Sequence, residues 1–327
     1  MEPTYRVLYI DAFNLFYRMF SAFDASDSNG EPVGGFVGSV VNIQKLIEKF
    51  KVQEVIVCFD GPDAGMRRRS VYKEYKGKRG RKKRFSVVKI GDDKELVDNE
   101  QEQLRLLYSF LKHLPIKVVV IPYYEADDVI GYLVSKNQQY TNIIVSADKD
   151  YLQLVNSKTF VWSPQKKILY TPEVLTAEWK TAPENITYVR ALVGDTSDKL
   201  SGVKGIGQDT VFKLLPQLHT EIYESFDQFW GQVENLEEGK SKTIKSLKEN
   251  KEQAKTMYKL MKLDYTCLNQ KAIEMLDVQL TEQENKDFSK VSFKLFCVKQ
   301  KLESYIKNFD LWIRPFLFLK KDVKLKV

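Results

Sequence analysis

YRVLYIDAFN (5–14) sets the fold of this chain, because its first seven residues form an apolar run that ends in an aspartate. Such a run predicts a buried strand over 5–11. Three later segments have the same apolar character, namely EVIVCFD (54–60), IKVVVI (116–121) and NIIVSAD (142–148). Residues 35–50 and 98–113, which lie between these strands, have helical spacing of apolar residues. Alternating strands and helices predict an α/β protein with a mostly parallel central sheet and helices on both faces.

The composition restricts the classes of site that the chain can contain. Its 327 residues are 43% hydrophobic, which is enough for a sizeable core, and no apolar run approaches a membrane span. The three cysteines are an odd number without metal-ligand spacing, and His113 and His219 lie far apart. This pattern argues against a disulfide framework, a thiolate zinc site and a histidine metal site. The N-terminus has no signal-peptide pattern, so we expect a soluble, cytoplasmic protein, and we further expect a monomer.

The positive charge is concentrated in one segment. The net charge is +7, and RRRSVYKEYKGKRGRKKR (67–84) contains Glu74 as its single acid. Such a run is either a solvated face or a site for a polyanion. Tyr72, Tyr75 and Phe85 lie among these cations, a pattern that suits single-stranded nucleic acid through stacking and phosphate contacts. A mobile, solvated loop is the alternative interpretation.

Acidic side chains follow the predicted strands. The carboxyl ends of parallel strands share one edge of the sheet, and open α/β folds bind their ligands there. YYEADDVIGY (123–132) opens the helix after the third strand, so its acids reach the same edge, and SADKD and GDTSD supply further acids. The predicted cluster comprises Asp11, Asp60, Glu125, Asp127, Asp128, Asp148, Asp150, Asp195 and Asp198.

A cluster of this kind needs positive charge, because neighbouring carboxylates cannot all stay ionised without cations. Oxygen ligands without histidine or cysteine suit Mg²⁺ or Mn²⁺. Two such ions about 3.5–4 Å apart support phosphodiester hydrolysis. Taken alone, EADD at a helix start is more often a dipole-complementing cap, and SxDxD is usually a turn. Asp128 in particular could be a structural acid while Glu125 and Asp127 face the metals.

GVKGIG (202–207) lies between two helical patterns. Its glycines allow the close backbone approach that presents N–H groups to a phosphate. The motif does not follow a strand, so it fails the context of a dinucleotide-binding fingerprint. An ordinary connection between two helices is the alternative, but the position next to GDTSD favours binding of a nucleic-acid backbone.

Together these residues resemble the flap endonuclease (5′ nuclease) family, most closely the bacteriophage RNase H-type 5′→3′ exonucleases. The resemblance runs from about residue 5 to 215 and is carried, in the family's order, by YIDAFN, CFDG, YKGKR, YYEADD, SADKD with YLQL, GDTSD and GVKGIG; WSPQKK (162–167) is similar to the phage branch. It implies a PIN-like 5′-nuclease fold with a helical arch over about 67–97. It further implies a catalytic domain over 1–180, and a helix-three-turn-helix element with a helical C-terminal region over 181–327.

The resemblance also implies roles for individual residues. The nine acids would hold two Mg²⁺ ions, with Mn²⁺ as a substitute. Lys76 and Arg79 match the arch bases that engage the scissile phosphate, and Tyr75 would be a stacking partner. The duplex would bind at Gly202, Val203, Lys204, Gly205, Ile206 and Gly207, where the carbonyls of Val203 and Ile206 can hold a K⁺ ion.

The sequence departs from the family pattern at two places. Lys199 replaces the asparagine that often follows the last aspartate, and Asp209-Thr210 replaces Lys-Thr after the glycine motif. Asp209 removes an expected phosphate-binding charge, which Lys199, Lys204 and Lys213 could offset. These departures leave the strength of duplex binding open and do not affect the metal chemistry.

The implied activity is metal-dependent cleavage of 5′ flaps and RNA primers on duplex DNA during replication, with RNase H activity. Two alternatives stay open: a DNA-binding protein with a decayed site, and a toxin-type PIN-like ribonuclease. The first is disfavoured by the intact acids, and the second by the basic segment and the glycine motif. FDLWIRPFLFLKK (309–321) favours core packing. A docking segment for a single-stranded-DNA-binding protein or a polymerase clamp is the alternative.

Overall fold

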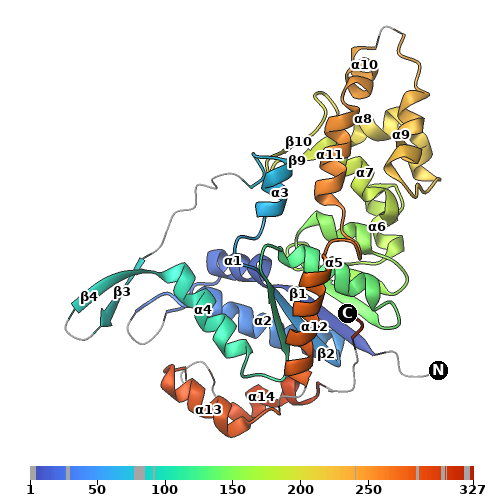
Figure 1. Cartoon of the computed structure of the whole chain (residues 1–327). Helices are drawn as coiled ribbons and strands as arrows, with labels where there is room; N and C mark the ends of the chain where they lie inside the picture. The colour runs from blue at the N-terminus through green and yellow to red at the C-terminus, as the bar shows by residue number, and fades with distance from the viewer. Residues whose placement is uncertain are drawn as a thin grey trace.

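The computed structural model describes residues 5–26, 30–76, 85–90, 93–239, 241–284, 287–302, 306, 308–319 and 325–327. A six-stranded sheet in the order β5-β2-β1-β6-β7-β8 forms its centre (Figure 1). The strands are β1 (Arg6–Asp11), β2 (Glu54–Asp60), β5 (Lys117–Ile121), β6 (Thr141–Val145), β7 (Thr159–Ser163) and β8 (Ile168–Tyr170). All neighbours pair in parallel except β7 and β8. The predicted, mostly parallel sheet is confirmed.

Helices cover both faces of the sheet, as expected. Leu8 and Ile10 of β1 join one buried cluster, and Val7 and Tyr9 join the other. This alternation follows from the period of two of a strand, and burial on both faces explains why the strands are continuous apolar runs. One cluster includes side chains of α1 (Ala12–Ala22), α2 (Gly34–Phe50) and α4 (Asn99–Leu111), and the other includes side chains of α5 (Ala126–Lys136), α6 (Pro172–Trp179) and α12 (Gln270–Glu284).

The edge strand β5 is covered by α12. Gln283 accepts a 2.8 Å hydrogen bond from the Val118 N–H and donates a 3.0 Å bond to the Val118 carbonyl. Gln279, one turn earlier, makes the same two bonds to Val120 at 3.0 and 2.9 Å. The two amides thus take the place of a neighbouring strand, which satisfies an edge that would otherwise be open to pairing. A helix from the C-terminal third of the chain thus packs on the core of the sheet.

A second, helical unit extends from the carboxyl edge of the sheet. It begins with α7 (Ile186–Val193), continues through the short strands β9 (Gly194–Asp195) and β10 (Leu200–Ser201), and reaches α8 (Gln208–Leu214) after GVKGIG. The following helices are α9 (Phe226–Glu234), α10 (Lys242–Glu249) and α11 (Lys251–Met261). Figure 1 shows α8, α9 and α10 at one end of the molecule and α13 (Lys290–Lys299) and α14 (Phe309–Leu317) at the opposite end, with the sheet between them.

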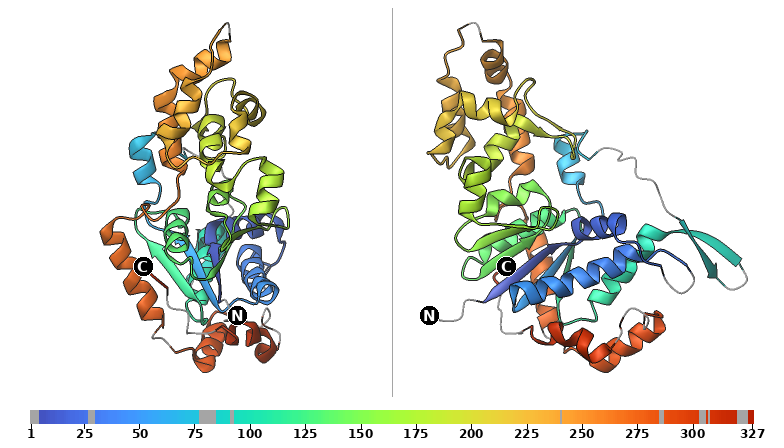
Figure 2. Two further views of the ribbon diagram at one scale, coloured as in Figure 1. Left: turned by 90° about the vertical axis from the view of Figure 1, so that its right-hand side faces the viewer. Right: turned by 180° about the vertical axis from the view of Figure 1, so that it is seen from behind.

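The helical arch predicted over 67–97 is wrong for most of its length. Among the described residues of this range, only α3 (Met66–Val71) is helical, and β3 (Phe85–Ile90) pairs with β4 (Asp93–Asp98) as an antiparallel hairpin. In FSVVKI (85–90) and KELVD (94–98), charged or polar residues alternate in part with apolar residues. This period of two favours a strand over a helix. The hairpin stands away from the rest of the chain (Figure 2).

The aromatic C-terminal segment packs in part on the core. Ile313 and Phe316 of α14 are fully buried, whereas Leu311 and Phe318 are more than 60% exposed. Core packing is therefore confirmed for one face of α14, and the docking role of the other face stays a prediction. In the described part of the chain, no helix has the length and apolar character needed to cross a bilayer.

Candidate active site

The carboxyl edge of the sheet brings acids of separate strands together. Asp11 is the last residue of β1, and Asp60 is the last residue of the neighbouring strand β2, two positions beyond the Asp11–Cys58 pair. From the sequence we expect Asp148 to end a strand, but in the structure it lies three residues beyond the end of β6 at Val145. It caps η1 (Lys149–Leu154) by accepting a 2.9 Å hydrogen bond from the Asp150 N–H. All these acids nevertheless face the same edge.

The EADD motif begins α5 and is tied to β2. Asp60 accepts a 2.9 Å hydrogen bond from the Ala126 N–H, and Asp128 accepts a 3.2 Å bond from the Glu125 N–H in a capping box. The interpretation of Asp128 as a structural acid at the helix start is therefore confirmed. The capping contacts fix the direction in which Glu125 and Asp127 leave the helix, and their role as metal ligands stays a prediction.

A buried arginine supplies most of the positive charge at EADD. The Arg68 guanidinium contacts Glu125, lies 3.0 Å from Asp127 Oδ1 and 2.9 Å from Asp128 Oδ1, and is 4% exposed. Its Nε donates a 3.1 Å hydrogen bond to the carbonyl of Leu260 on α11. We expected metal ions alone to compensate these carboxylates, and that expectation was incomplete. Arg68 was missed because it lies in a basic run whose pattern indicates a solvated face.

Lys76 of the basic segment also binds Glu125. Lys76 Nζ lies 2.8 Å from Glu125 Oε1, and the Lys76 N–H donates a 2.9 Å bond to the Asp198 carbonyl. Burial alone would raise the pKa of Glu125, but Arg68 and Lys76 hold that pKa at about 2. Lys76 therefore lies at the acid cluster, as its predicted role requires. Arg79, its predicted partner, is outside the described residues.

The predicted stacking role of Tyr75 disagrees with its position. Tyr75 is 2% exposed, and its hydroxyl donates a 2.6 Å hydrogen bond to Glu125 Oε2. Its ring lies in a small cluster with Met257 and Met261 of α11. Apolar contacts and a charged acceptor hold the ring inside, so no face is open to a base. Tyr75 instead orients Glu125.

A second buried arginine links the acids of the two units. Arg190 of α7 lies 2.8 Å from Asp150 and 2.7 Å from Asp195. Burial raises the pKa of Asp150 to about 8, although Arg190 opposes this shift. Asp195 also accepts hydrogen bonds from Ser197, and Ser197 and Arg190 lower its pKa against the effect of burial. Arg190 was not predicted, since an arginine on an apolar helix carries no sequence signal.

Three acids lack such a partner. None of the cations in the described ranges forms an ion pair with Asp11, Asp60 or Asp148. Burial, together with the neighbouring negative charge of Asp60, raises the pKa of Asp11 to about 8. Burial also raises the pKa values of Asp60 and Asp148. The excess negative charge thus lies at the ends of β1, β2 and β6, where a cation would relieve most repulsion.

The chemistry of this cluster fits hard divalent cations. Every candidate ligand is a carboxylate, and the three acids without an ion pair among the described residues lie at or just beyond the ends of the adjacent strands β2, β1 and β6, close to Asp127. Across the described chain, no three histidine, cysteine, aspartate or glutamate side chains already converge as a finished ligand set. Arg68, Lys76 and Arg190 occupy carboxylate oxygens of Glu125, Asp127, Asp128, Asp150 and Asp195, and the role of the acids as metal ligands stays a prediction.

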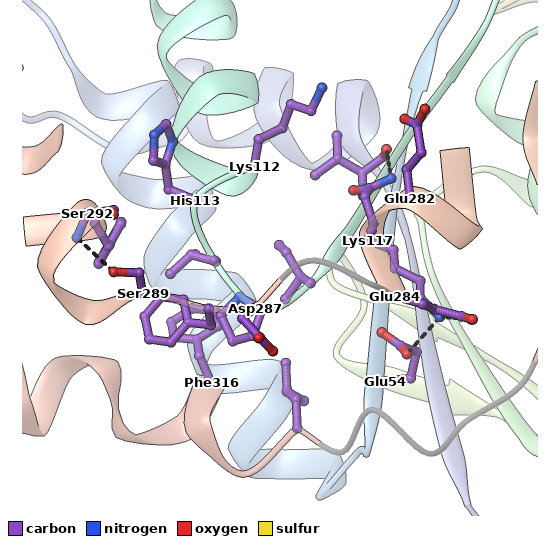
Figure 3. Close-up of a pocket in the computed structure, with 18 of the residues that line it drawn as sticks. Glu54, Lys112, His113, Lys117, Glu282, Glu284, Asp287, Ser289, Ser292 and Phe316 are labelled. Atoms are coloured by element: carbon purple, nitrogen blue, oxygen red, sulfur yellow. Dashed lines mark hydrogen bonds and ion pairs between the residues drawn. The ribbon is translucent and has the colours of Figure 1, made fainter. Parts of the chain in front are cut away.

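Cavities lie both beside this cluster and away from it. A cleft of about 170 Å³ next to Asp148 is lined by Lys149 and Lys166 from the sheet side and by Gln208 from α8. A larger cavity of about 830 Å³ lies between β5, α4, α12, α13 and α14, next to the ion pair of Lys117 with Glu54 and Glu284 (Figure 3). Volume does not identify the active site here, because the larger cavity contains none of the predicted acids.

The glycine motif combines a packed part and an open part. A Cβ at Gly202 would lie 2.2 Å from the Val193 carbonyl, so this glycine allows α7 and the motif to touch. Val203 and Ile206 are buried, whereas Lys204, Gly205 and Gly207 are exposed. At Gly205 and Gly207 nothing lies within 4 Å of a built Cβ, so a phosphate backbone can approach there. Gly202 has a packing role, and duplex binding at the other positions stays a prediction.

The comparisons with known proteins agree with this arrangement. Residues 6–180 match the model of the 5′-3′ exonuclease N-terminal resolvase-like domain, and residues 181–286 match that of the C-terminal SAM fold. The chain is 31% identical to the 5′-3′ exonuclease of Aquifex aeolicus over 314 residues, which cover 93% of this chain and 96% of the relative. It is 35% identical to the thermostable DNA polymerase I of Thermus thermophilus over 238 residues, which cover 72% of this chain but only 25% of that polymerase.

A solved structure shows the same fold. The structure titled "Divalent metal ions (zinc) bound to T5 5′-exonuclease" has a TM-score of 0.65 and 21% identity, and covers 86% of this chain and 97% of that chain. A complex of the T5 flap endonuclease with DNA and metal ions has a TM-score of 0.64 at 21% identity, with the same coverage. The curated relatives described above are bacterial, so the phage-like origin suggested by residues 162–167 stays a prediction.

Proposed function

This chain belongs to the 5′-3′ exonuclease family, and on that premise we propose that it is a divalent-metal-dependent, structure-specific 5′ nuclease. It hydrolyses phosphodiesters of 5′ flaps and of RNA primers on duplex DNA, with RNase H activity. The observation that supports the proposal most is the convergence of Asp11, Asp60 and Asp148 around Asp127 at one edge of the sheet, without ion-pair partners among the described cations.

The nine acids have distinct parts in this proposal. Asp11, Asp60, Asp127 and Asp148 would hold one of two Mg²⁺ ions, for which Mn²⁺ can substitute, and Asp150, Asp195 and Asp198 would complete the ligands of the other. Bound divalent cations supply a water of lowered pKa and stabilise the leaving oxygen. Glu125 and Asp128 position the helix start, and their roles as direct ligands need the release of Arg68 or Lys76.

The basic segment would act on the substrate. Lys76 Nζ lies 2.8 Å from Glu125 Oε1, and its side chain is 25% exposed, so it can turn toward a phosphate. We propose that Lys76 and Arg79 stabilise the negative charge that builds on the scissile phosphate.

The second unit would anchor the duplex. Residues 1–180 form the catalytic domain in this proposal, and residues 181–327 carry Val203, Lys204, Gly205, Ile206 and Gly207, with a K⁺ ion at the carbonyls of Val203 and Ile206. The exposed backbone at Gly205 and Gly207 supports this assignment. A single-stranded-DNA-binding protein or a polymerase clamp is the proposed partner in replication, in the cytoplasm.

One assay separates this function from its alternatives. Labelled 5′-flap DNA, an RNA primer annealed to DNA, and unpaired RNA are each incubated with the protein and Mg²⁺ or EDTA. We expect Mg²⁺-dependent products from the flap and the primer. Flap binding without any product would indicate a decayed site, and preferential cleavage of unpaired RNA would indicate a toxin-type ribonuclease.

A further inference from the structure

Arg68 uses its whole guanidinium inside the acid cluster. Its Nη1 binds Glu125 and Asp127, its Nη2 binds Asp128, and its Nε binds the Leu260 carbonyl. The side chain therefore joins α3, the start of α5 and the end of α11, which are remote in the sequence. Within a buried site, such a cation stabilises the carboxylates only while its contacts stay intact.

These contacts use oxygens that a metal ion would also need. Both oxygens of Glu125 are taken, Oε2 by Arg68 and Tyr75 and Oε1 by Lys76. Asp127 gives Oδ1 to Arg68 at 3.0 Å. A divalent cation that binds these acids must share or displace the guanidinium, because two positive charges in one poorly solvated site repel each other.

We propose that Arg68 is a positioning residue that substitutes for a divalent cation at Glu125, Asp127 and Asp128, and that metal entry weakens its contacts and so loosens α3 from α5 and α11. This inference rests on the metal dependence in the proposed function. It adds that metal binding and the position of α3, which begins the basic segment, are coupled.

The neighbouring arginines provide matched controls. Arg69 lies next to Arg68 on α3, is exposed, and makes one 3.4 Å bond to the Ala64 carbonyl. Arg67 is 46% exposed and contacts only Asp128 among the acids. Substitution of Arg69 changes the same net charge on the same helix but leaves the carboxylates paired.

The test is the melting temperature of the full chain in EDTA and in saturating Mg²⁺, for the wild type and for Arg68→Gln, Arg68→Lys and Arg69→Gln. In EDTA we expect Arg68→Gln to melt about 6–10 °C below the wild type, because three buried carboxylates lose their partner. Mg²⁺ should recover most of this loss, so its stabilising shift is larger in Arg68→Gln than in the wild type. Arg68→Lys should lie between the two, and Arg69→Gln should follow the wild type.

An equal loss with and without Mg²⁺ would show that Arg68 is only a packing element and would overturn the inference. If Arg68→Gln does not fold, hydrogen–deuterium exchange of α3 in the wild type tests the proposed coupling instead. Faster exchange at Met66–Val71 on addition of Mg²⁺ supports the coupling, and unchanged or slower exchange contradicts it. Measurements on the wild type distinguish a failure of this inference from a failure of the proposed function. If Mg²⁺ neither shifts the melting temperature of the wild type nor supports cleavage, the nuclease assignment itself fails.

Discussion

Asp60 at the end of β2 accepts a 2.9 Å hydrogen bond from the backbone N–H of Ala126, the first residue of α5. This bond fixes the start of an acidic helix against the end of a strand that lies 66 positions earlier in the chain. Two groups of acids thereby share one edge of the sheet.

Lys76 should matter more for cleavage than for binding. Lys76→Ala removes a cation that lies 2.8 Å from Glu125, so we expect cleavage to slow by about 10²–10³-fold while duplex affinity changes by less than about threefold. Single-turnover rates and binding titrations with a flap substrate measure the two quantities. Lys73→Ala, an exposed lysine of the same segment, is the control and should keep nearly full activity. Parallel losses of rate and affinity in Lys76→Ala would remove its assigned role.

Tyr75 should contribute to stability and not to stacking on DNA. Tyr75→Phe keeps the ring but deletes the 2.6 Å bond to Glu125, so the free energy of unfolding should fall by about 1.5–3 kcal/mol. Affinity for the flap substrate should stay unchanged. Urea denaturation and binding titrations check both expectations. An unfolding free energy equal to that of the wild type would show that this hydrogen bond does not form in solution.

Stability without metal should fall as the pH rises. Burial raises the pKa values of Asp11 and Asp150 to about 8, far above the value of about 3.9 in the unfolded chain. The folded state therefore binds more protons between about pH 4 and pH 8, and the free energy of unfolding decreases across this window. The lowered pKa of Glu125 makes the free energy of unfolding increase with pH instead. Because that pKa is about 2, this effect is confined to pH values below about 4.5.

Melting curves in EDTA at several pH values measure this dependence. Mg²⁺ should reverse the loss at the alkaline end, because metal binding favours the ionised carboxylates. Melting temperatures that climb from pH 5 to pH 8 in EDTA would contradict the account.

Asp209 should weaken duplex binding. It is exposed in the first turn of α8, directly after the glycine motif, where a phosphate would approach. Asp209→Asn should raise duplex affinity about two- to fivefold at low salt, and the gain should shrink as salt screens the charge. Asp277→Asn, an exposed acid on α12, is the control for net charge. If both variants gain equally, long-range charge and not a local contact is responsible.

The sheet and its acids could be predicted because their signals are local. Continuous apolar runs determine buried strands, and an aspartate at the end of each run reaches the common edge in a parallel topology. Asp11 and Asp60 followed from this rule, and only the exact place of Asp148, beyond β6, did not.

The countercharges could not be predicted, because their partners are remote. Arg68 meets Glu125 across 57 positions and Arg190 meets Asp150 across 40, and neither arginine differs in local pattern from a solvated one. The same limit explains Tyr75, whose burial depends on α11. The hairpin of β3 and β4 was missed for another reason, since the helical arch was inferred from family resemblance and not from the alternation of its residues.

The most direct test is a crystal of the protein soaked in Mn²⁺, with anomalous diffraction used to locate the ions. We expect anomalous peaks at the carboxyl edge of the sheet, with carboxylate oxygens of Asp11, Asp60, Asp127 and Asp148 within about 2–2.5 Å. Peaks confined to other surfaces, with this edge empty at saturating Mn²⁺, would contradict the claim that these acids hold the catalytic cations.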